Sequence, residues 1–259
     1  MSQDVFQRYG AYYDLLYRDK DYGAEAEYVA RTLRAASPKV QSLLEFGSGT
    51  GKHGRLLARH GFNLFGVERS EMMVARMRQT SQEDPQVGDG SFDCMQGDMH
   101  TVELGRVFDG VLALFHVVSY QTRNVELLQT LANAARHVRP GGLFLFDVWH
   151  GPAVLAQRPS VRLKRVEDEN TRLTRIAEPE LDTNAGVVTV RYTMLAEAKR
   201  DGRLTTFEEE HRMRYLFPSE IDLLAVQTGF EVARSEEFLT GKVPSESTWG
   251  VAYLLRKQG

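Results

Sequence analysis

The stretch Val40–Gly51, VQSLLEFGSGTG, decides the fold of this chain. An apolar run ends in the acidic residue Glu45, and Gly47, Gly49 and Gly51 follow on alternate positions. This pattern is typical of a buried strand that enters a loop at the strand end where open α/β sheets bind ligands. Glycine suits such a loop because it adopts positive φ and lets the backbone approach a ligand closely.

Short apolar runs alternate with helical patterns up to about residue 148, which predicts a doubly wound, mostly parallel α/β sheet. The expected strands are residues 43–46, 62–68, 92–98, 108–115 and 143–149. The expected helices that connect them are residues 52–60, 70–79 and 124–138. A tyrosine-rich segment, residues 1–38, is predicted to form a helical cover ahead of the sheet.

The pattern changes to period-two alternation from about residue 161 to residue 217, with turn signals at residues 184–186 and 201–202. This predicts an antiparallel sheet inserted after the fifth strand. A helix over residues 218–230 and two closing strands, 231–239 and 248–257, then complete a seven-stranded main sheet. We therefore expect a main domain over residues 1–160 and 216–259 and an inserted sheet over residues 161–215.

Composition narrows the class of protein. The chain has 259 residues, 32 basic and 35 acidic, and this near balance argues against a dedicated nucleic-acid or membrane-surface binder. The single cysteine, Cys94, excludes an internal disulfide framework and fits a reducing compartment. No signal-peptide pattern and no apolar run of about 20 residues is present, so a cytoplasmic location is expected. No constellation of metal ligands stands out, and a homodimer is a candidate assembly.

Two carboxylates help to identify the ligand of the glycine loop. Glu68 ends the second strand, where an acid can accept hydrogen bonds from vicinal ribose hydroxyls. Asp98 ends the third strand, where a carboxylate can accept from an exocyclic adenine amine while Met99 packs near the ring. Because Gly49–Gly54 also matches GxGxxG, a dinucleotide ligand stays open on the loop alone.

These motifs, together with residues 108–115 and the turn RPGGLFLFD at 139–147, resemble class I S-adenosylmethionine (SAM)-dependent methyltransferases. A closer likeness runs nearly end to end, through residues 12–26, 114–120 and 211–217. It is to the bacterial enzymes that N-methylate amino groups of nucleotide-linked deoxysugars. The resemblance implies SAM as cofactor and a small-molecule acceptor, with a nucleotide sugar as the leading candidate and the inserted sheet as a wall of the acceptor pocket. It implies these cofactor-binding residues: Tyr13, Tyr17, Tyr22, Glu45, Gly47, Gly49, Glu68, Arg69, Asp98, Met99 and Leu114.

The expected reaction is methyl transfer to an amine or a hydroxyl. If the acceptor is an amine, it must be neutral when it attacks, so a group that handles a proton is useful. Tyr120 occupies the position that can carry an active-site histidine in the resembled family, and His116 lies one helical turn earlier. Both are predicted to be catalytic. His211 faces the pocket only if the alternation of its strand has the right parity, and the acidic run Glu208–Glu210 is interpreted as a solvated face.

Two alternatives stay open beside a methyltransferase. An NAD(P)-dependent oxidoreductase would use the GxGxxG overlap and Glu68, although the sequence offers no Tyr and Lys pair at a suitable spacing. A non-catalytic module could bind SAM as a structural ligand or a sensor. The inserted sheet favours an acceptor pocket, and hence an enzyme.

Overall fold

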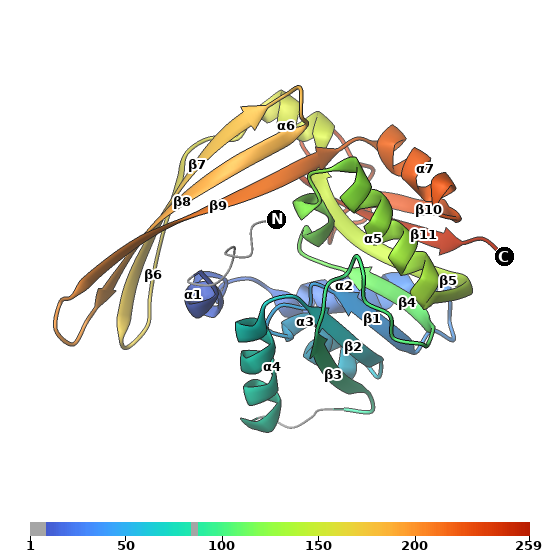
Figure 1. Cartoon of the computed structure of the whole chain (residues 1–259), viewed down its shortest axis with the longest axis horizontal. Coiled ribbons are helices and arrows are strands. Elements are labelled where there is room, and N and C mark those ends of the chain that lie inside the picture. Colours follow the sequence, from blue (N-terminus) through green and yellow to red (C-terminus); the bar gives the residue numbers. More distant parts are fainter. Residues whose placement is uncertain (1–8, 84–87) are drawn as a thin grey trace.

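The computed structural model describes residues 9–83 and 88–259, and its centre is a twisted sheet (Figure 1). The eleven strands of these residues form one hydrogen-bonded sheet, more than the seven predicted, and its main part has the order β3-β2-β1-β4-β5-β11-β10. The parallel strands are β1 (Ser42–Phe46), β2 (Asn63–Glu68), β3 (Ser91–Gln96), β4 (Phe108–Ala113) and β5 (Val138–His150). The antiparallel closing strands are β11 (Gly250–Lys257) and β10 (Phe230–Glu237). The predicted doubly wound, mostly parallel sheet is confirmed.

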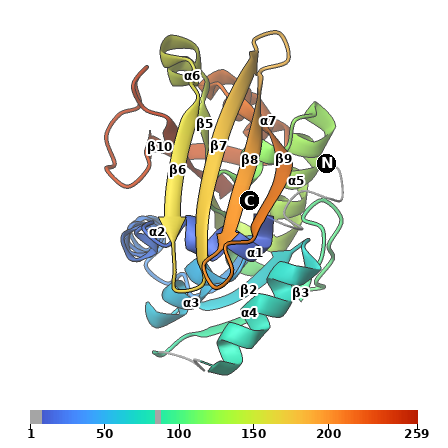
Figure 2. The ribbon, with the colours of Figure 1, turned by 90° about the vertical axis from the view of Figure 1, so that its left-hand side faces the viewer.

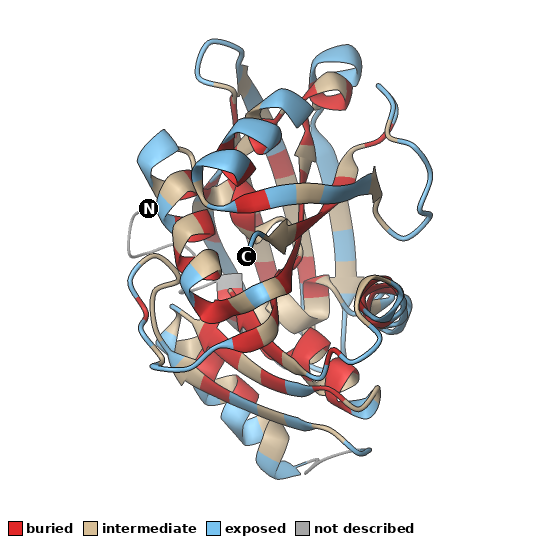
Figure 3. Cartoon of the chain, turned by 90° about the vertical axis from the view of Figure 1, so that its right-hand side faces the viewer, coloured by how far each residue is buried: buried red, intermediate tan, exposed pale blue. Residues whose placement is uncertain are grey.

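Helices cover both faces of this sheet. Those on one face are α2 (Tyr22–Ala36) and α3 (Lys52–Arg59), and those on the other are α5 (Asn124–His137) and α7 (Pro218–Gln227). Consecutive residues of β1 alternate between the faces: Leu43 packs with the α2 and α3 side, and Leu44 packs with the α5 and α7 side. The central strands β1 and β4 are therefore buried along most of their length, as expected for a parallel sheet covered on both faces (Figure 3).

The inserted sheet consists of four antiparallel strands that arch away from the main sheet (Figures 1 and 2). They are β6 (Arg162–Glu167), β7 (Thr171–Asp182), β8 (Val187–Ala198) and β9 (Leu204–Leu216). The joint with the main sheet is short, because β9 pairs with β5 only at Trp149↔Tyr215 and His150↔Leu216. A helix that the sequence did not predict, α6 (Gly151–Gln157), leads into this sheet with a proline in its first turn.

The predicted N-terminal cover is divided into two helices in the described residues. Helix α1 (Tyr9–Leu16) and α2 are separated by a turn, and the Asp21 side chain caps α2 by accepting from Ala24 N at 2.8 Å. Helix α1 packs on the inserted sheet, where Leu16 joins Leu173, Met194 and Phe207 in one apolar cluster. It therefore lies where the two sheets approach each other. Residues 1–8 of the predicted cover lie outside the described residues.

Candidate active site

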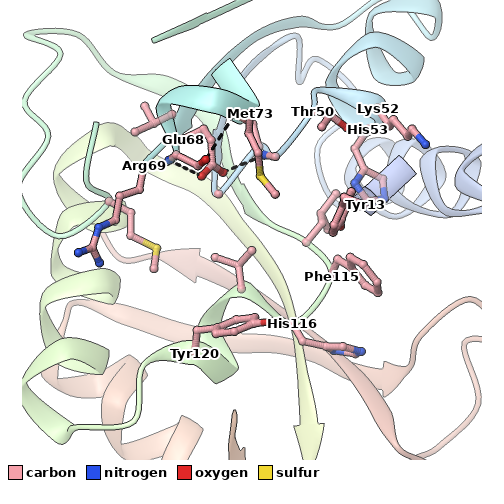
Figure 4. Close-up of a pocket in the computed structure, with 18 of the residues that line it drawn as sticks. Tyr13, Thr50, Lys52, His53, Glu68, Arg69, Met73, Phe115, His116 and Tyr120 are labelled. Atoms are coloured by element: carbon pink, nitrogen blue, oxygen red, sulfur yellow. Dashed lines mark hydrogen bonds between the residues drawn. The ribbon is translucent and has the colours of Figure 1, made fainter. Parts of the chain in front are cut away.

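A cavity of about 950 Å³ lies between the carboxyl ends of the main strands and the inserted sheet. Ligand pockets commonly have volumes of about 300–1,000 Å³, so this one lies at the upper end of that range. The predicted residues of the main strands and their loops that line it are Gly47, Gly49, Glu68, Arg69, Asp98, Met99 and Leu114. Tyr13, Tyr17 and Tyr22 line it from the N-terminal segment, and His116 and Tyr120 line its other end (Figure 4).

The glycine loop has the backbone that the sequence predicted. Gly47, Gly49 and Gly51 have φ angles of 66°, 56° and 78°, a left-handed conformation that other residues rarely adopt. A Cβ on Gly47 would lie 2.7 Å from a Val117 methyl group, whereas one on Gly49 would meet nothing within 4 Å. The loop therefore packs tightly behind Gly47 and leaves open space at Gly49, as a cradle for a ligand requires.

Glu68 is held in place by the backbone on either side of it. Its Oε2 accepts from Gly49 N at 2.9 Å, and its Oε1 accepts from Ser70 N at 2.8 Å. Burial raises the pKa of this carboxyl, and the two backbone donors partly oppose the rise. Each carboxylate oxygen has two lone pairs, so both retain the capacity to accept from a ribose hydroxyl. This geometry fits the predicted role of Glu68.

Asp98 shares the cavity with Glu68, as the predicted cofactor site requires. Its Oδ1 accepts from His100 N at 2.9 Å and lies 2.7 Å from His100 Nδ1. The opposite ring nitrogen, His100 Nε2, is hydrogen-bonded to Gln121 Oε1 at 2.8 Å. This arrangement orients the Asp98 carboxylate and leaves Oδ2 for an adenine amine. The sequence interpretation missed His100, whose position two residues after Asp98 was the available signal.

Glu45 is the exception among the predicted cofactor residues, because the lining of the cavity does not include it. Its side chain is buried behind the loop, and its Oε2 has no hydrogen-bond partner among the described residues. Burial, with a smaller contribution from the nearby charge of Glu68, raises the pKa of Glu45 to about 8. The structure therefore places a neutral acid beneath the glycine loop near neutral pH rather than a contact surface for the cofactor.

Asp14 connects α1 to the cofactor end of the cavity through ion pairs and a hydrogen bond. One of its carboxylate oxygens lies 2.9 Å from Lys52 Nζ and 3.2 Å from Thr50 Oγ1, both next to the glycine loop. The other oxygen lies 3.0 Å from Arg76 Nε on α4 (Glu71–Glu83). The sequence interpretation singled out tyrosines in this segment and missed the carboxylate between them.

The aromatic side chains of the N-terminal segment form a wall of the cavity. The rings of Tyr13 and Tyr17 lie 4.8 Å apart, and the edge of Tyr17 meets Phe115 at 5.1 Å. Tyr22 packs edge-on against His53 at 5.0 Å. Burial raises the pKa of Tyr13 and Tyr22, so their hydroxyls stay neutral. Their rings line the cavity, and their contact with the cofactor stays a prediction.

His116 stands at the end of β4 in an unusual backbone conformation. Both Phe115 and His116 have positive φ, 65° and 61°, which costs free energy in residues other than glycine and is often found at functional sites. His116 Nδ1 lies 2.7 Å from Asp147 Oδ2, and its backbone N–H donates to the same oxygen at 3.1 Å. Burial raises the pKa of Asp147, but its contacts with His116 lower the pKa by more. The net shift is downward, so Asp147 is a carboxylate. Asp147 therefore orients the His116 ring, which lines the cavity.

Tyr120 ends the short helix η1 (Val117–Tyr120), and its hydroxyl is hydrogen-bonded to His211 Nδ1 at 2.8 Å. His211 lies on β9 and lines the cavity, which settles the parity that the sequence left open. The prediction of a solvated face at Glu208–Glu210 was wrong for Glu209. Its side chain is only 8% exposed and lies 3.4 Å from His211 Nε2, because residues two apart on a strand share a face.

Three further features of the described residues concern membrane helices, metal ligands and the cysteine. No helix in residues 9–83 and 88–259 is long and apolar enough to cross a membrane. In the same ranges, no three His, Cys, Asp or Glu side chains gather as metal ligands. Cys94 is a buried core residue, packed with Val74 and Met77 of α4.

Comparisons with known proteins agree with this geometry. A family model described as a methyltransferase domain matches residues 43–142. The chain is 29% identical, over 88% of its length, to dTDP-3-amino-3,4,6-trideoxy-alpha-D-glucopyranose N,N-dimethyltransferase of Streptomyces venezuelae, of which it covers 91%. It is 30% identical, again over 88% of its length, to dTDP-3-amino-3,6-dideoxy-alpha-D-glucopyranose N,N-dimethyltransferase of Streptomyces fradiae, of which it covers 84%.

Solved structures are similar over nearly the whole chain. SAM-bound CalS10, an amino pentose methyltransferase from Micromonospora echinaspora, has a TM-score of 0.74 at 26% identity, with 98% of each chain covered. A SAM-dependent methyltransferase from Clostridium acetobutylicum has a TM-score of 0.80, with 99% of this chain and all of that chain covered. Its 17% identity supports the fold alone.

Proposed function

The chain belongs to the class I SAM-dependent methyltransferases, and we propose that it methylates the amino group of a nucleotide-linked amino deoxysugar. SAM is its methyl donor. The alternatives of an NAD(P)-dependent oxidoreductase and of a non-catalytic SAM-binding module are set aside by the family. Support for the acceptor comes from the curated relatives, which are named for dTDP-amino sugars.

The observation that carries the proposal is a single cavity with two chemically different ends. Glu68 lies at one end, and His116 and Tyr120 lie at the other (Figure 4), while Asp98 lines the same cavity. The volume of about 950 Å³ accommodates a second ligand beside the cofactor. An acceptor in that remaining space would meet the nitrogen and oxygen atoms that suit an amine.

The proposed SAM site lies at the end of the cavity beside the glycine loop. In our proposal the backbone at Gly47 and Gly49 contacts the cofactor, and Glu68 accepts hydrogen bonds from the ribose hydroxyls of the cofactor. Asp98 and Met99 contact the adenine, and Arg69 and Leu114 lie beside them. Tyr13, Tyr17 and Tyr22 cover the site. Glu45 supports the loop from behind.

Transfer requires little chemistry from the protein. Bound SAM supplies an electrophilic methyl carbon on a sulfonium, to which the amine lone pair forms the N–C bond while the S–C electron pair returns to sulfur. The side chains align the nucleophile and exclude water, which is where most of the rate enhancement arises. His116 and Tyr120 are the proposed catalytic residues, since each presents a group that can accept a hydrogen bond from the amine.

The test is methyl transfer from labelled SAM to a matched set of acceptors. We expect label in a dTDP-linked 3-amino deoxysugar and none in the same nucleotide sugar with a hydroxyl in place of the amine. The free amino sugar without its nucleotide should be a poorer acceptor. Equal labelling of the hydroxyl compound, or labelling only of small amines and phenols, would contradict the proposed acceptor while leaving a SAM-dependent methyltransferase.

Three further expectations stay predictions: a cytoplasmic location, a homodimer as a candidate assembly, and no binding of nucleic acid. The last follows from the near balance of 32 basic and 35 acidic residues. Light scattering on the purified protein measures its assembly directly.

A further inference from the structure

We propose that the proton of the acceptor amine leaves along a relay in which Tyr120 passes it to His211 and Glu209 stabilises the charge. This inference rests on the proposed function, since it concerns an amine acceptor. It assigns roles to two residues of the inserted sheet, His211 and Glu209. The inserted sheet then takes part in the chemistry as well as enclosing the acceptor.

The relay joins the two sheets of the molecule. Tyr120 comes from η1, which follows β4 at the carboxyl ends of the parallel strands. Its Oη is 2.8 Å from Nδ1 of His211 on β9. Both side chains line the cavity, whereas Glu209 lies behind His211, with Oε2 3.4 Å from His211 Nε2. His211 is 2% exposed, so the imidazole is shielded from solvent. The sequence of groups is therefore phenol, imidazole and carboxylate, with the phenol nearest the acceptor.

The direction of the relay fixes the tautomer of His211. Tyr120 donates its hydroxyl proton to Nδ1, so the neutral ring carries its proton on Nε2, facing Glu209. A distance of 3.4 Å is long for a neutral N–H···O bond, but the attraction between opposite charges favours the pair once the ring is protonated. Glu209 thereby stabilises the imidazolium.

The protons balance in each step of the relay. The substrate ammonium gives one proton to Tyr120 Oη as Tyr120 gives its own to His211 Nδ1, and the amine nitrogen recovers its lone pair. Tyr120 ends as a neutral phenol, and His211 ends as an imidazolium beside the Glu209 carboxylate. Burial raises the pKa of Tyr120 well above its ordinary value, which suits a group that passes a proton without resting as a phenolate. A second methylation repeats the step on the methylated ammonium after His211 has returned its proton through Tyr120 to water in the vacated cavity.

Other polar groups around His211 come from the neighbouring strands. The ring of Tyr192 on β8 lies 4.8 Å from the His211 ring, and Arg175 on β7 stacks on Tyr192 at 4.8 Å. Arg175 also donates to Tyr17 Oη at 3.3 Å. The positive charge of Arg175 disfavours an imidazolium at His211, and the Glu209 carboxylate offsets it. Removing the Glu209 charge should therefore weaken His211 as a proton acceptor.

One experiment reads the relay without any acceptor. Nitrogen-15 spectra of histidine-labelled full-length protein with S-adenosylhomocysteine report the tautomer of each ring, and the spectrum of His211→Gln identifies the His211 signals. We expect the neutral His211 ring to carry its proton on Nε2, and we expect its nitrogen signals to change in Tyr120→Phe, which removes the donor to Nδ1. An Nδ1–H tautomer, or His211 signals that are the same in Tyr120→Phe, would overturn the relay.

A second experiment uses an amino sugar nucleotide that the unaltered enzyme methylates. We expect Tyr120→Phe and His211→Gln each to lower kcat about 30-fold near pH 7, with KM little changed, and the double variant to be no slower than the slower single variant. The losses should shrink as the pH rises, because the amine then loses its proton to water. Losses that multiply in the double variant, or that persist at high pH, would overturn the relay.

The matched control lies one residue away. Glu208 is exposed and points to the opposite face of β9, so Glu208→Gln should leave kcat unchanged while Glu209→Gln lowers it. Equal effects of the two substitutions would overturn the relay, and SAM affinity confirms that each variant is folded. If the unaltered enzyme methylates no amino sugar nucleotide, the proposed acceptor fails, whereas the histidine spectra still decide the hydrogen-bond arrangement.

Discussion

The two ends of the cavity are built in different ways. At the cofactor end, the loop carrying Gly47 and Gly49 and the carboxylate of Glu68 belong to adjacent strands of one parallel sheet, and a backbone hydrogen bond joins them. At the acceptor end, Tyr120 and His211 are separated by 91 residues. Tyr120 lies in η1 of the main domain, and His211 lies in β9 of the inserted sheet. The first end depends on the main sheet alone, and the second depends on how the inserted sheet is attached.

This difference predicts which changes affect which end. The attachment between the sheets consists of the pairs Trp149↔Tyr215 and His150↔Leu216, together with the packing of α1 and α6. A change at the acceptor end should therefore alter turnover and leave SAM affinity intact. A change at the cofactor end should alter SAM affinity first. The predictions below test this separation.

The largest effect is expected for Glu68→Ala. The substitution removes the acceptor of the ribose hydroxyls and leaves Gly49 N and Ser70 N without their partner. Hydrogen bonds to a charged group contribute about 1.5–3 kcal/mol each, so SAM affinity should fall about 100-fold. Isothermal titration with SAM measures it. Glu231→Gln, an exposed carboxylate on β10, is the control and should bind as the unaltered protein does.

The acceptor end is tested by His116→Ala. We expect kcat to fall about 10-fold, because the side chain lines the acceptor end and is oriented by Asp147, while SAM affinity stays the same. His60→Ala, at the end of α3, serves as the histidine control. A His116 variant that binds SAM poorly but turns over normally once saturated would contradict the separation of the two ends.

The same difference explains what the sequence could predict. Gly47, Glu68 and Asp98 each stand where an apolar run ends, and parallel strands bring their carboxyl ends to one edge, so local pattern was sufficient. Asp147 gave no such signal. It lies inside the run LFLFDVW, and its partner His116 is brought to it by the pairing of β4 with β5.

The role of Glu209 was hidden by its neighbours. Three consecutive glutamates favour a solvated face, yet Phe207, Met213 and Tyr215 are apolar at every second position around Glu209 and His211. Those three residues are buried, and they fix the parity of β9. The signal was present in the alternation, but which face of the strand met the main domain depends on tertiary packing.

Asp14→Asn should loosen the cover of the cofactor end by a smaller amount. Its partners Lys52 and Arg76 have side chains about a third exposed, and such ion pairs contribute about 0.2–1 kcal/mol each. We expect SAM to dissociate about 5-fold faster, with kcat at saturating SAM little changed. Stopped-flow displacement measures the rate. Asp19→Asn, which removes a contact of the same segment with Lys164 on the inserted sheet, is the control and should leave the rate unchanged.

The smallest effect is expected for Glu45→Gln, and it depends on pH. Burial raises the folded-state pKa of Glu45 from 4.5 to about 8, so the folded protein binds a proton that the unfolded chain releases between these values. The neutral acid favours folding fully below about pH 4.5, and this contribution is lost as the pH rises through 8. The melting temperature of Glu45→Gln should therefore rise relative to that of the unaltered protein between pH 5 and pH 9, by about 2–4 °C per kcal/mol relieved.

The matched control for this pH dependence is Glu231→Gln, whose exposed carboxyl should give the same melting curve as the unaltered protein at every pH. A constant difference between Glu45→Gln and the unaltered protein would mean that Glu45 is ionised in the folded state. The carboxylate would then need a cation, and the nearest cationic group available is His53, whose Nδ1 lies 3.9 Å from Glu45 Oε1. In that case Glu45 would be a charged part of the cofactor end, and the glycine loop would depend on a buried ion pair as well as on its backbone conformation.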